Sequence, residues 1–354
     1  MKLRYLISAF TLFLTLCFLS VWLCAILLGK RQAADDIIQP PPLVSEIPQL
    51  PSVPAGISDM IPPSSESSMP ESFDPTPLPA EYAEPADDAD LVTDIGFEIS
   101  STETYPGEYI MVYAYGDIAA AEISVNCPFS RDPVFFEQGE RLVALLPIKF
   151  TYEPGEYLLT LSAGERTESF TIHLLSKEWQ TQNLTVSGEV VEQTIESISA
   201  NEEYNDKVAP KKSLFEAVPL WDGSFIQPVA GRITTEFGML RTVNGVPSDR
   251  HGGVDIAAPR GTPVAAANGG KVIFAEYIAL TGNTVCIEHG MGLKSWYYHM
   301  DSLAVAQDDI VLKGQKIGEV GSTGFSTGPH LHWATSVFNV YVNPWSLVEA
   351  APEI

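Results

Sequence analysis

Histidine and aspartate residues recur at short spacings in the last third of the sequence. His251 and Asp255 stand four residues apart in RHGGVD, with two glycines between them. Glycines disfavour a helix, and in an extended chain residues 251, 253 and 255 point to the same side. Imidazole nitrogens and carboxylate oxygens are ligands of Zn²⁺. The pair could therefore converge on one metal ion.

Two further pairs have the spacing of residues that share one face of a strand. His330 and His332 lie in TGPHLHW, and Tyr297 and His299 lie in SWYYHM. On a strand, one histidine of the first pair could bind a metal while its neighbour serves as a proton donor or a second ligand. Tyr297, on the face expected for His299, could donate a hydrogen bond to a reaction intermediate. Two imidazoles and one carboxylate would leave one zinc position open for water, as hydrolysis requires.

Each pair also has an ordinary structural explanation. A histidine four residues from an aspartate is often a surface hydrogen bond, and two histidines on a strand often form a polar face. Four of the six histidines nevertheless fall in these motifs, within one glycine-rich segment. This concentration favours a metal site with a single Zn²⁺.

The elements that must position these residues are mostly strands, and we expect a mainly β fold. Residues 218–350 combine strand-like runs with frequent glycines, which predicts a compact all-β domain. Residues 183–210 have apolar residues at helical spacing and predict a connecting helix with Ser187 as its cap. Residues 91–176 contain six short β-branched or aromatic runs, which indicate a small immunoglobulin-like β-sandwich.

The N-terminal part is predicted to anchor and tether these domains. Residues 5–29 carry no charge and would form a helix of about 38 Å, long enough to cross a hydrocarbon core of about 30 Å. A cleaved signal peptide is the competing interpretation, but its apolar region is usually about 7 to 15 residues long. Residues 32–90 are rich in proline, serine and acids and predict a disordered linker.

Charge then suggests where the domains lie and excludes some partners. From Gln32 to Ser100 there are 14 acidic residues and no lysine or arginine, and the whole chain has a formal net charge of -25. This balance argues against nucleic acid as a partner. We expect a single-pass protein of the cell membrane, held in a bacterial membrane by residues 5–29, with its C-terminal domains on the extracytoplasmic side.

The segment from about residue 228 to residue 344 resembles the lysostaphin and LytM-type zinc metallopeptidases, a family that cleaves peptide bonds in bacterial peptidoglycan. The resemblance extends over the motifs GRITTEFG, HGGVDIAAPRGTPV, GNTVCIEHG, WYYHM, LKGQKIGEVGSTG and TGPHLH. One departure is that HLH is followed here by Trp333 and Ala334, where the family usually has Phe-Glu. Those positions are not ligands, so the departure bears only on substrate fit.

The resemblance implies a function and a role for each residue. It implies a membrane-anchored zinc metalloendopeptidase with the β fold of this family, acting on a cross-bridge or stem peptide. It also implies that His251, Asp255 and His332 bind Zn²⁺, and that His299 and His330 are catalytic. The alternative is a silent scaffold or activator of cell-wall hydrolases, or a component of a sporulation membrane bridge. Such relatives typically lose metal ligands, whereas this chain has the complete set.

Overall fold

The computed structural model describes residues 94–129 and 131–354, all within one compact unit of the chain. The predicted membrane anchor (5–29), the predicted linker (32–90) and the first three residues of the predicted sandwich (91–93) lie outside these residues. In the part of the chain that is described, no helix is both long enough and apolar enough to cross a membrane. The described chain consists largely of strands with a few short helices, which confirms the mainly β prediction.

Two four-stranded sheets make up the first region. The strands of one sheet, in spatial order, are β1 (Gly96–Ile99), β3 (Tyr109–Tyr115), β6 (Arg141–Pro147) and β5 (Phe136–Gln138). Those of the other are β2 (Glu103–Thr104), β8 (Arg166–Leu174), β7 (Gly155–Ala163) and β4 (Ser124–Asn126), and a 3₁₀ turn spans Ala120–Glu122. Alternate residues of both sheets, such as Val112 and Leu159, are fully buried in a shared core.

The connecting segment is more divided than the single helix predicted over 183–210. It contains strand β9 (Thr181–Leu184), helices α2 (Gly188–Gln193) and α3 (Ile198–Lys207), and a 3₁₀ turn over Ala209–Ser213. Ser187 caps α2 as predicted, by accepting a hydrogen bond from the Val190 N–H. Thr194 ends α2 with non-helical dihedral angles, and Ser197 caps α3 with its own side chain. The prediction of one continuous helix is therefore wrong.

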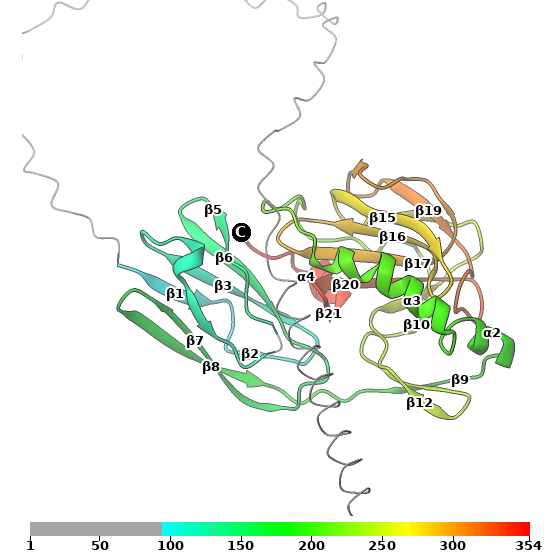
Figure 1. The fold of residues 1–354 in the computed structure, drawn as a ribbon, viewed down its shortest axis with the longest axis horizontal. Coiled ribbons are helices and arrows are strands. Elements are labelled where there is room, and N and C mark those ends of the chain that lie inside the picture. The colour runs from blue at the N-terminus through cyan, green and yellow to red at the C-terminus, as the bar shows by residue number, and fades with distance from the viewer. Residues whose placement is uncertain (1–93, 130) are drawn as a thin grey trace, which may run out of the picture. The chain divides into compact units, whose positions relative to one another are not determined.

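A ten-stranded sheet dominates the last region. Its main path runs through β10 (Arg232–Thr235), β13 (Val254–Ala257), β20 (His330–Val337), β17 (Leu293–Leu303), β16 (Gly282–Glu288), β15 (Gly270–Ile278) and β18 (Ile310–Val311). Off this path lie β14 (Pro263–Ala265), β19 (Lys316–Val320) and β21 (Val340–Val342), followed by helix α4 (Pro344–Glu349). Figure 1 shows β15, β16 and β17 side by side. Apolar side chains such as Ile256, Val285 and Leu331 are fully buried in its core.

A small three-stranded sheet, the fourth among the described residues, joins the connector to this region. It contains β12 (Val246–Ser248), β11 (Leu240–Val243) and β9, in that order. Strand β9 pairs in parallel with β11, and Gln182 is opposite Arg241. The connector thus contributes a strand, and not only a tether, beside the elements that carry His251 and Asp255.

A bulge in β17 sets the direction of its side chains. The register of β17 against β16 shifts between Asn283 and Val285, so one residue of β16 faces two of β17. His299 has φ 63°, a left-handed conformation that is uncommon for residues other than glycine. The extra residue interrupts the alternation of faces along β17.

This bulge overturns the prediction made for Tyr297. Tyr297 is fully buried in the core, where its hydroxyl oxygen accepts hydrogen bonds from Ala267 N–H at 2.7 Å and Ser295 Oγ at 2.9 Å. Tyr298, one residue later, lies on the side of His299 and lines the pocket described below. Tyr297 is therefore part of the core and is not available to a substrate.

The change Tyr297→Phe should destabilise the fold, because it leaves the buried Ala267 N–H without its acceptor. We expect a loss of about 1 to 3 kcal/mol in the free energy of unfolding, measured by urea denaturation. The control is Tyr277→Phe, since Tyr277 is 55% exposed on β15 and should change stability by less than about 0.5 kcal/mol. Equal stability of the two variants would contradict the role assigned to Tyr297.

Candidate metal centre

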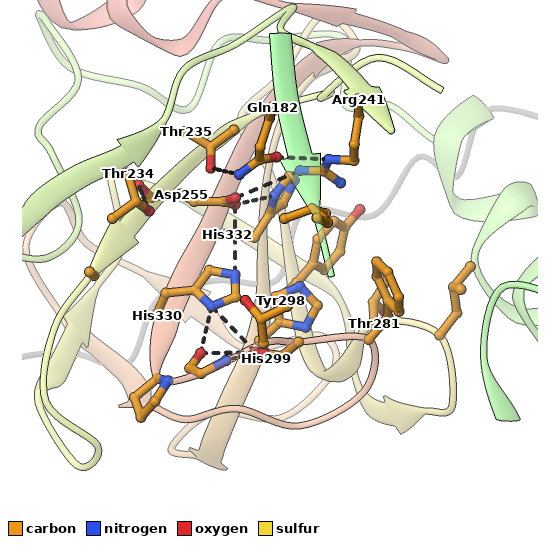
Figure 2. Close-up of a pocket in the computed structure, with 18 residues that line it drawn as sticks. Gln182, Thr234, Thr235, Arg241, Asp255, Thr281, Tyr298, His299, His330 and His332 are labelled. Carbon is orange, nitrogen blue, oxygen red and sulfur yellow. Dashed lines mark hydrogen bonds and ion pairs between the residues drawn. The ribbon is translucent and has the colours of Figure 1, made fainter. Parts of the chain in front are cut away.

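Three adjacent strands place Asp255, His299, His330 and His332 around one pocket, and His251 lies just before the first of these strands. In the antiparallel register, Asp255 of β13 is opposite His332 of β20, which in turn is opposite Tyr298 of β17. His330 lies two residues before His332 on the same face of β20. Figure 2 shows these side chains gathered in the pocket with His299. The pocket has a volume of about 430 Å³.

The three predicted metal ligands converge closely. His251 Nε2 lies 2.9 Å from Asp255 Oδ1 and 2.9 Å from His332 Nδ1. The third side of the triangle, from His332 Nδ1 to Asp255 Oδ1, is 2.8 Å. All three residues offer one ligand atom to a common point, the arrangement expected of a metal centre.

A close approach of two strands makes this convergence possible. Gly253 stands between His251 and Asp255, and a Cβ atom at this position would lie 2.5 Å from the Trp333 carbonyl oxygen. It would also lie 2.8 Å from His332 Nε2. A side chain at residue 253 would therefore push apart the two strands that carry Asp255 and His332.

The protonation of His251 fits a cation at the centre of the triangle. Its Nδ1 lies 3.0 Å from the Glu236 carbonyl oxygen, which can only accept a hydrogen bond. Nδ1 therefore carries the proton, and Nε2 directs a lone pair toward the carboxylate of Asp255. Lone pairs facing each other at 2.9 Å repel unless a proton or metal ion lies between them.

The distances also suit zinc. Zinc bound tetrahedrally, with bonds of about 2.0 to 2.1 Å, separates its ligand atoms by roughly 3.3 Å. The three atoms would need to move apart by only a few tenths of an ångström. Burial disfavours the charged form of Asp255, but His251 and His332 outweigh it and hold the pKa of this carboxyl well below its usual range. The carboxylate is therefore available as an anionic ligand.

His299 and His330 present the same kind of nitrogen to the pocket. His299 Nδ1 donates to the Thr323 carbonyl oxygen at 2.8 Å, and His330 Nδ1 donates to that of Gly328, also at 2.8 Å. The Nε2 atoms are thus left as bases, and His330 Nε2 lies 3.7 Å from Asp255 Oδ1. The two rings are 4.9 Å apart, so both lie beside the cluster without belonging to its triangle.

Burial keeps two of these histidines neutral. Burial, together with the neighbouring His330 and His332, lowers the pKa of His299 to about 3. Burial also lowers the pKa of His332 to about 4, against the effect of its hydrogen bond to Asp255. Neutral imidazole is the form that binds a metal or accepts a proton.

Three pocket residues escaped the sequence-based reasoning. Tyr298 stacks on the ring of His332 at 5.2 Å and 14°, which fixes the orientation of that ligand. Arg241 and Gln182 also line the pocket. The bulge places Tyr298 there, and the pairing of β9 with β11 places the other two, so no local motif could have identified them.

Comparison with known sequences supports the assignment of this region. Residues 249–344 match the sequence model of peptidase family M23. The chain contains an M23 peptidase domain.

Named relatives of this domain occur in bacteria. The chain is 43% identical over 104 residues to the DD-carboxypeptidase/endopeptidase Mpg of Neisseria meningitidis serogroup B, covering 29% of this chain and 24% of Mpg. It is 43% identical over 89 residues to the peptidoglycan DD-endopeptidase ShyB of Vibrio cholerae, covering 25% of this chain and 21% of ShyB. The chain thus spans about a quarter or less of the length of these relatives.

A solved structure is also similar to part of this chain. The catalytic domain of the antimicrobial peptidase lysostaphin from Staphylococcus simulans aligns with 34% of this chain and 92% of its own length. The sequence identity is 32%, and the TM-score is 0.31.

The remaining histidine of the M23 domain provides a test of the buried core. His289 is fully buried, with Nδ1 2.6 Å from the Gly269 carbonyl oxygen and Nε2 2.7 Å from Ser295 Oγ. Burial lowers its pKa to about 4. It contacts the core and lies outside the set of residues that line the pocket.

Acidification should destabilise the metal-free protein. The pKa values of His289, His299 and His332 are lower in the folded chain than the unfolded value of about 6.5, so the unfolded chain binds more protons as the pH falls below that value. We expect the free energy of unfolding, measured in urea with a chelator, to fall between about pH 7.5 and about pH 5.

His289→Gln should reduce this fall by about 2 kcal/mol, because it removes one of the buried groups that would be protonated on unfolding. The matched control is His173→Gln, which makes the same substitution at an exposed histidine of β8. A free energy of unfolding that is constant or rises on acidification would contradict the buried, neutral state of these histidines.

Proposed function

We propose that this chain is a zinc metalloendopeptidase that hydrolyses peptide bonds of bacterial peptidoglycan, in a cross-bridge or a stem peptide. The main observation behind this proposal is the triangle of His251 Nε2, Asp255 Oδ1 and His332 Nδ1, with sides of 2.8 to 2.9 Å. Two further histidine bases lie beside it. The M23 match and the names of the relatives support the reaction type and the peptidoglycan substrate.

The proposed mechanism divides the work among six side chains. His251, Asp255 and His332 would hold one Zn²⁺ and leave a position open. Zinc bound there would lower the pKa of a bound water to about 7 and polarise the carbonyl of the bond to be cut. Tyr298 holds the ring of His332 in place by stacking.

His330 and His299 would then handle the protons. Burial and the neighbouring imidazoles oppose protonation of His299, so we assign the acceptance of the water proton to His330, which is next to the cluster. The carbonyl of Gly328 stabilises the imidazolium that forms, through Nδ1–H. The proton must then reach the amine nitrogen of the leaving product. His299, with its ring 4.9 Å away, flanks that path.

The location of the protein is part of the same proposal. The uncharged residues 5–29 and the acidic segment after them support a single-pass anchor in the cell membrane. The domains at 91–176 and 218–350 would then face the cell wall on the extracytoplasmic side. This arrangement would bring the pocket to an insoluble substrate that cannot diffuse to it.

Substitution of the histidines should separate metal binding from catalysis. We expect His332→Ala to lose both bound zinc and hydrolysis of purified peptidoglycan, because it removes a ligand. His330→Ala should keep most of the zinc and lose roughly 10²- to 10⁴-fold in rate, the usual contribution of a general base. Zinc would be measured by atomic emission and products by mass spectrometry of released fragments.

The control for both variants is His173→Ala, since this exposed histidine lies on β8 and should leave zinc content and rate unchanged. Full hydrolysis by His332→Ala would refute the proposed site. A wild-type protein that binds zinc yet releases no fragments would instead indicate the scaffold or activator alternative.

A further inference from the structure

Arg241 is held at the wall of the pocket by the connector strand. It lies on β11, directly opposite Gln182 of β9. Its Nε donates to Gln182 Oε1 at 3.0 Å, and Gln182 Nε2 in turn donates to Thr235 Oγ1 at 2.6 Å. Gln182 therefore fixes the plane of the guanidinium group from outside the matched M23 segment.

The guanidinium has donors to spare. An arginine carries five N–H donors, and the bond to Gln182 occupies one of them. Among the described residues, neither terminal nitrogen of Arg241 forms a hydrogen bond; one of them lies 3.7 Å from Asp255 Oδ2, a longer ionic contact. The side chain is 19% exposed, so these donors can reach a molecule in the pocket.

The charge of Arg241 is conspicuous in this pocket. Of the described residues that line the pocket, Arg241 is the only lysine or arginine. Burial lowers its pKa, and Asp255 opposes that effect, but a guanidinium stays protonated in proteins. The chain as a whole is strongly acidic, with a net charge of -25. A partly desolvated guanidinium with free donors therefore makes this part of the pocket a specific binding point for an anion.

The position of Arg241 determines which part of a substrate it can reach. One oxygen of Asp255 belongs to the ligand triangle and the other faces Arg241. Figure 2 shows Arg241 and Gln182 at one end of the pocket and His299 and His330 at the other, with Asp255 and His332 between them. The guanidinium is thus held beside a predicted metal ligand, close to where an extended peptide would place the residue next to the bond that is cut.

We infer that Arg241 is a specificity-determining residue that binds a carboxylate on the substrate residue next to the bond that is cut. Gln182 is its positioning residue. The inference rests on the proposed hydrolysis of peptides and adds the chemical class of substrate. The carboxylate can be the free C-terminus of the substrate. In a cross-linked peptide it can instead be attached to the carbon that bears the nitrogen of the cut bond. Arginine suits either source, because its planar fork matches a carboxylate with two hydrogen bonds.

The test compares substrates that differ only in this charge. Two synthetic pairs are used: a linear peptide with a free or amidated C-terminus, and a cross-linked peptide with a free or amidated carboxylate next to the cut nitrogen. We expect the full-length zinc-loaded wild type to prefer the carboxylate form of at least one pair. Arg241→Gln should lose about 10- to 100-fold in kcat/KM on that form and little on the amide.

Further variants separate recognition from structural support. Gln182→Ala should lose part of the preference, and Arg241→Lys should regain part of it through charge alone. Arg232→Gln is the control, because Arg232 is an exposed arginine on β10 and should behave as wild type. The source of the carboxylate is identified by the substrate pair for which Arg241→Gln no longer prefers the carboxylate form over the amide form.

Two results would overturn the inference. Equal losses on carboxylate and amide, together with reduced zinc, would show that Arg241 only orients Asp255. A wild type that does not distinguish the members of either pair would show that it does not read a carboxylate. If the wild type cleaves no peptide, the proposed function fails, and calorimetric binding of the same peptides to wild type and Arg241→Gln decides the role of Arg241 independently.

Discussion

Three backbone carbonyl groups determine what the pocket can do. Those of Glu236, Thr323 and Gly328 each accept the Nδ1–H of a histidine: His251, His299 and His330, respectively. Each bond forces the lone pair of Nε2 toward the interior of the pocket. The ligand triangle and the two bases depend on this constraint, because a ring with the other tautomer would present a proton where a metal or a water proton must be bound.

The fold is arranged to satisfy that constraint. The carbonyl of Glu236 lies between β10 and β11, and those of Thr323 and Gly328 lie between β19 and β20. The pairing of β10 with β13 and of β13 with β20 brings these segments to one place. The bulge in β17 turns His299 toward Thr323, at the cost of a left-handed backbone conformation. Asp255 completes the arrangement by sharing its carboxylate between the triangle and Arg241. The connector reaches the same point through Gln182, so the pocket is built from more than the M23 segment.

The sequence allowed part of this site to be predicted, and the rest depended on tertiary structure. Asp255, His330 and His332 lie on paired strands and His251 lies just before one of them, so residue alternation and the resemblance brought these residues to one site. Alternation failed for Tyr297, because one inserted residue in β17 exchanges the two faces. The connector was expected to be one helix, but Thr194 and Ser197 break it, and its first residues pair with β11. Arg241 and Gln182 are 59 residues apart, and only this parallel pairing brings them together.

The most direct measurement of the central claim is anomalous scattering from a crystal of the protein, recorded on both sides of the zinc absorption edge. The account predicts one zinc peak within bonding distance of His251 Nε2, Asp255 Oδ1 and His332 Nδ1, at about 2.0 to 2.2 Å from each. The Nε2 atoms of His299 and His330 should face the open side of that ion. A zinc-supplemented crystal with no peak at this triangle, or with the ion held by other residues, would contradict the account.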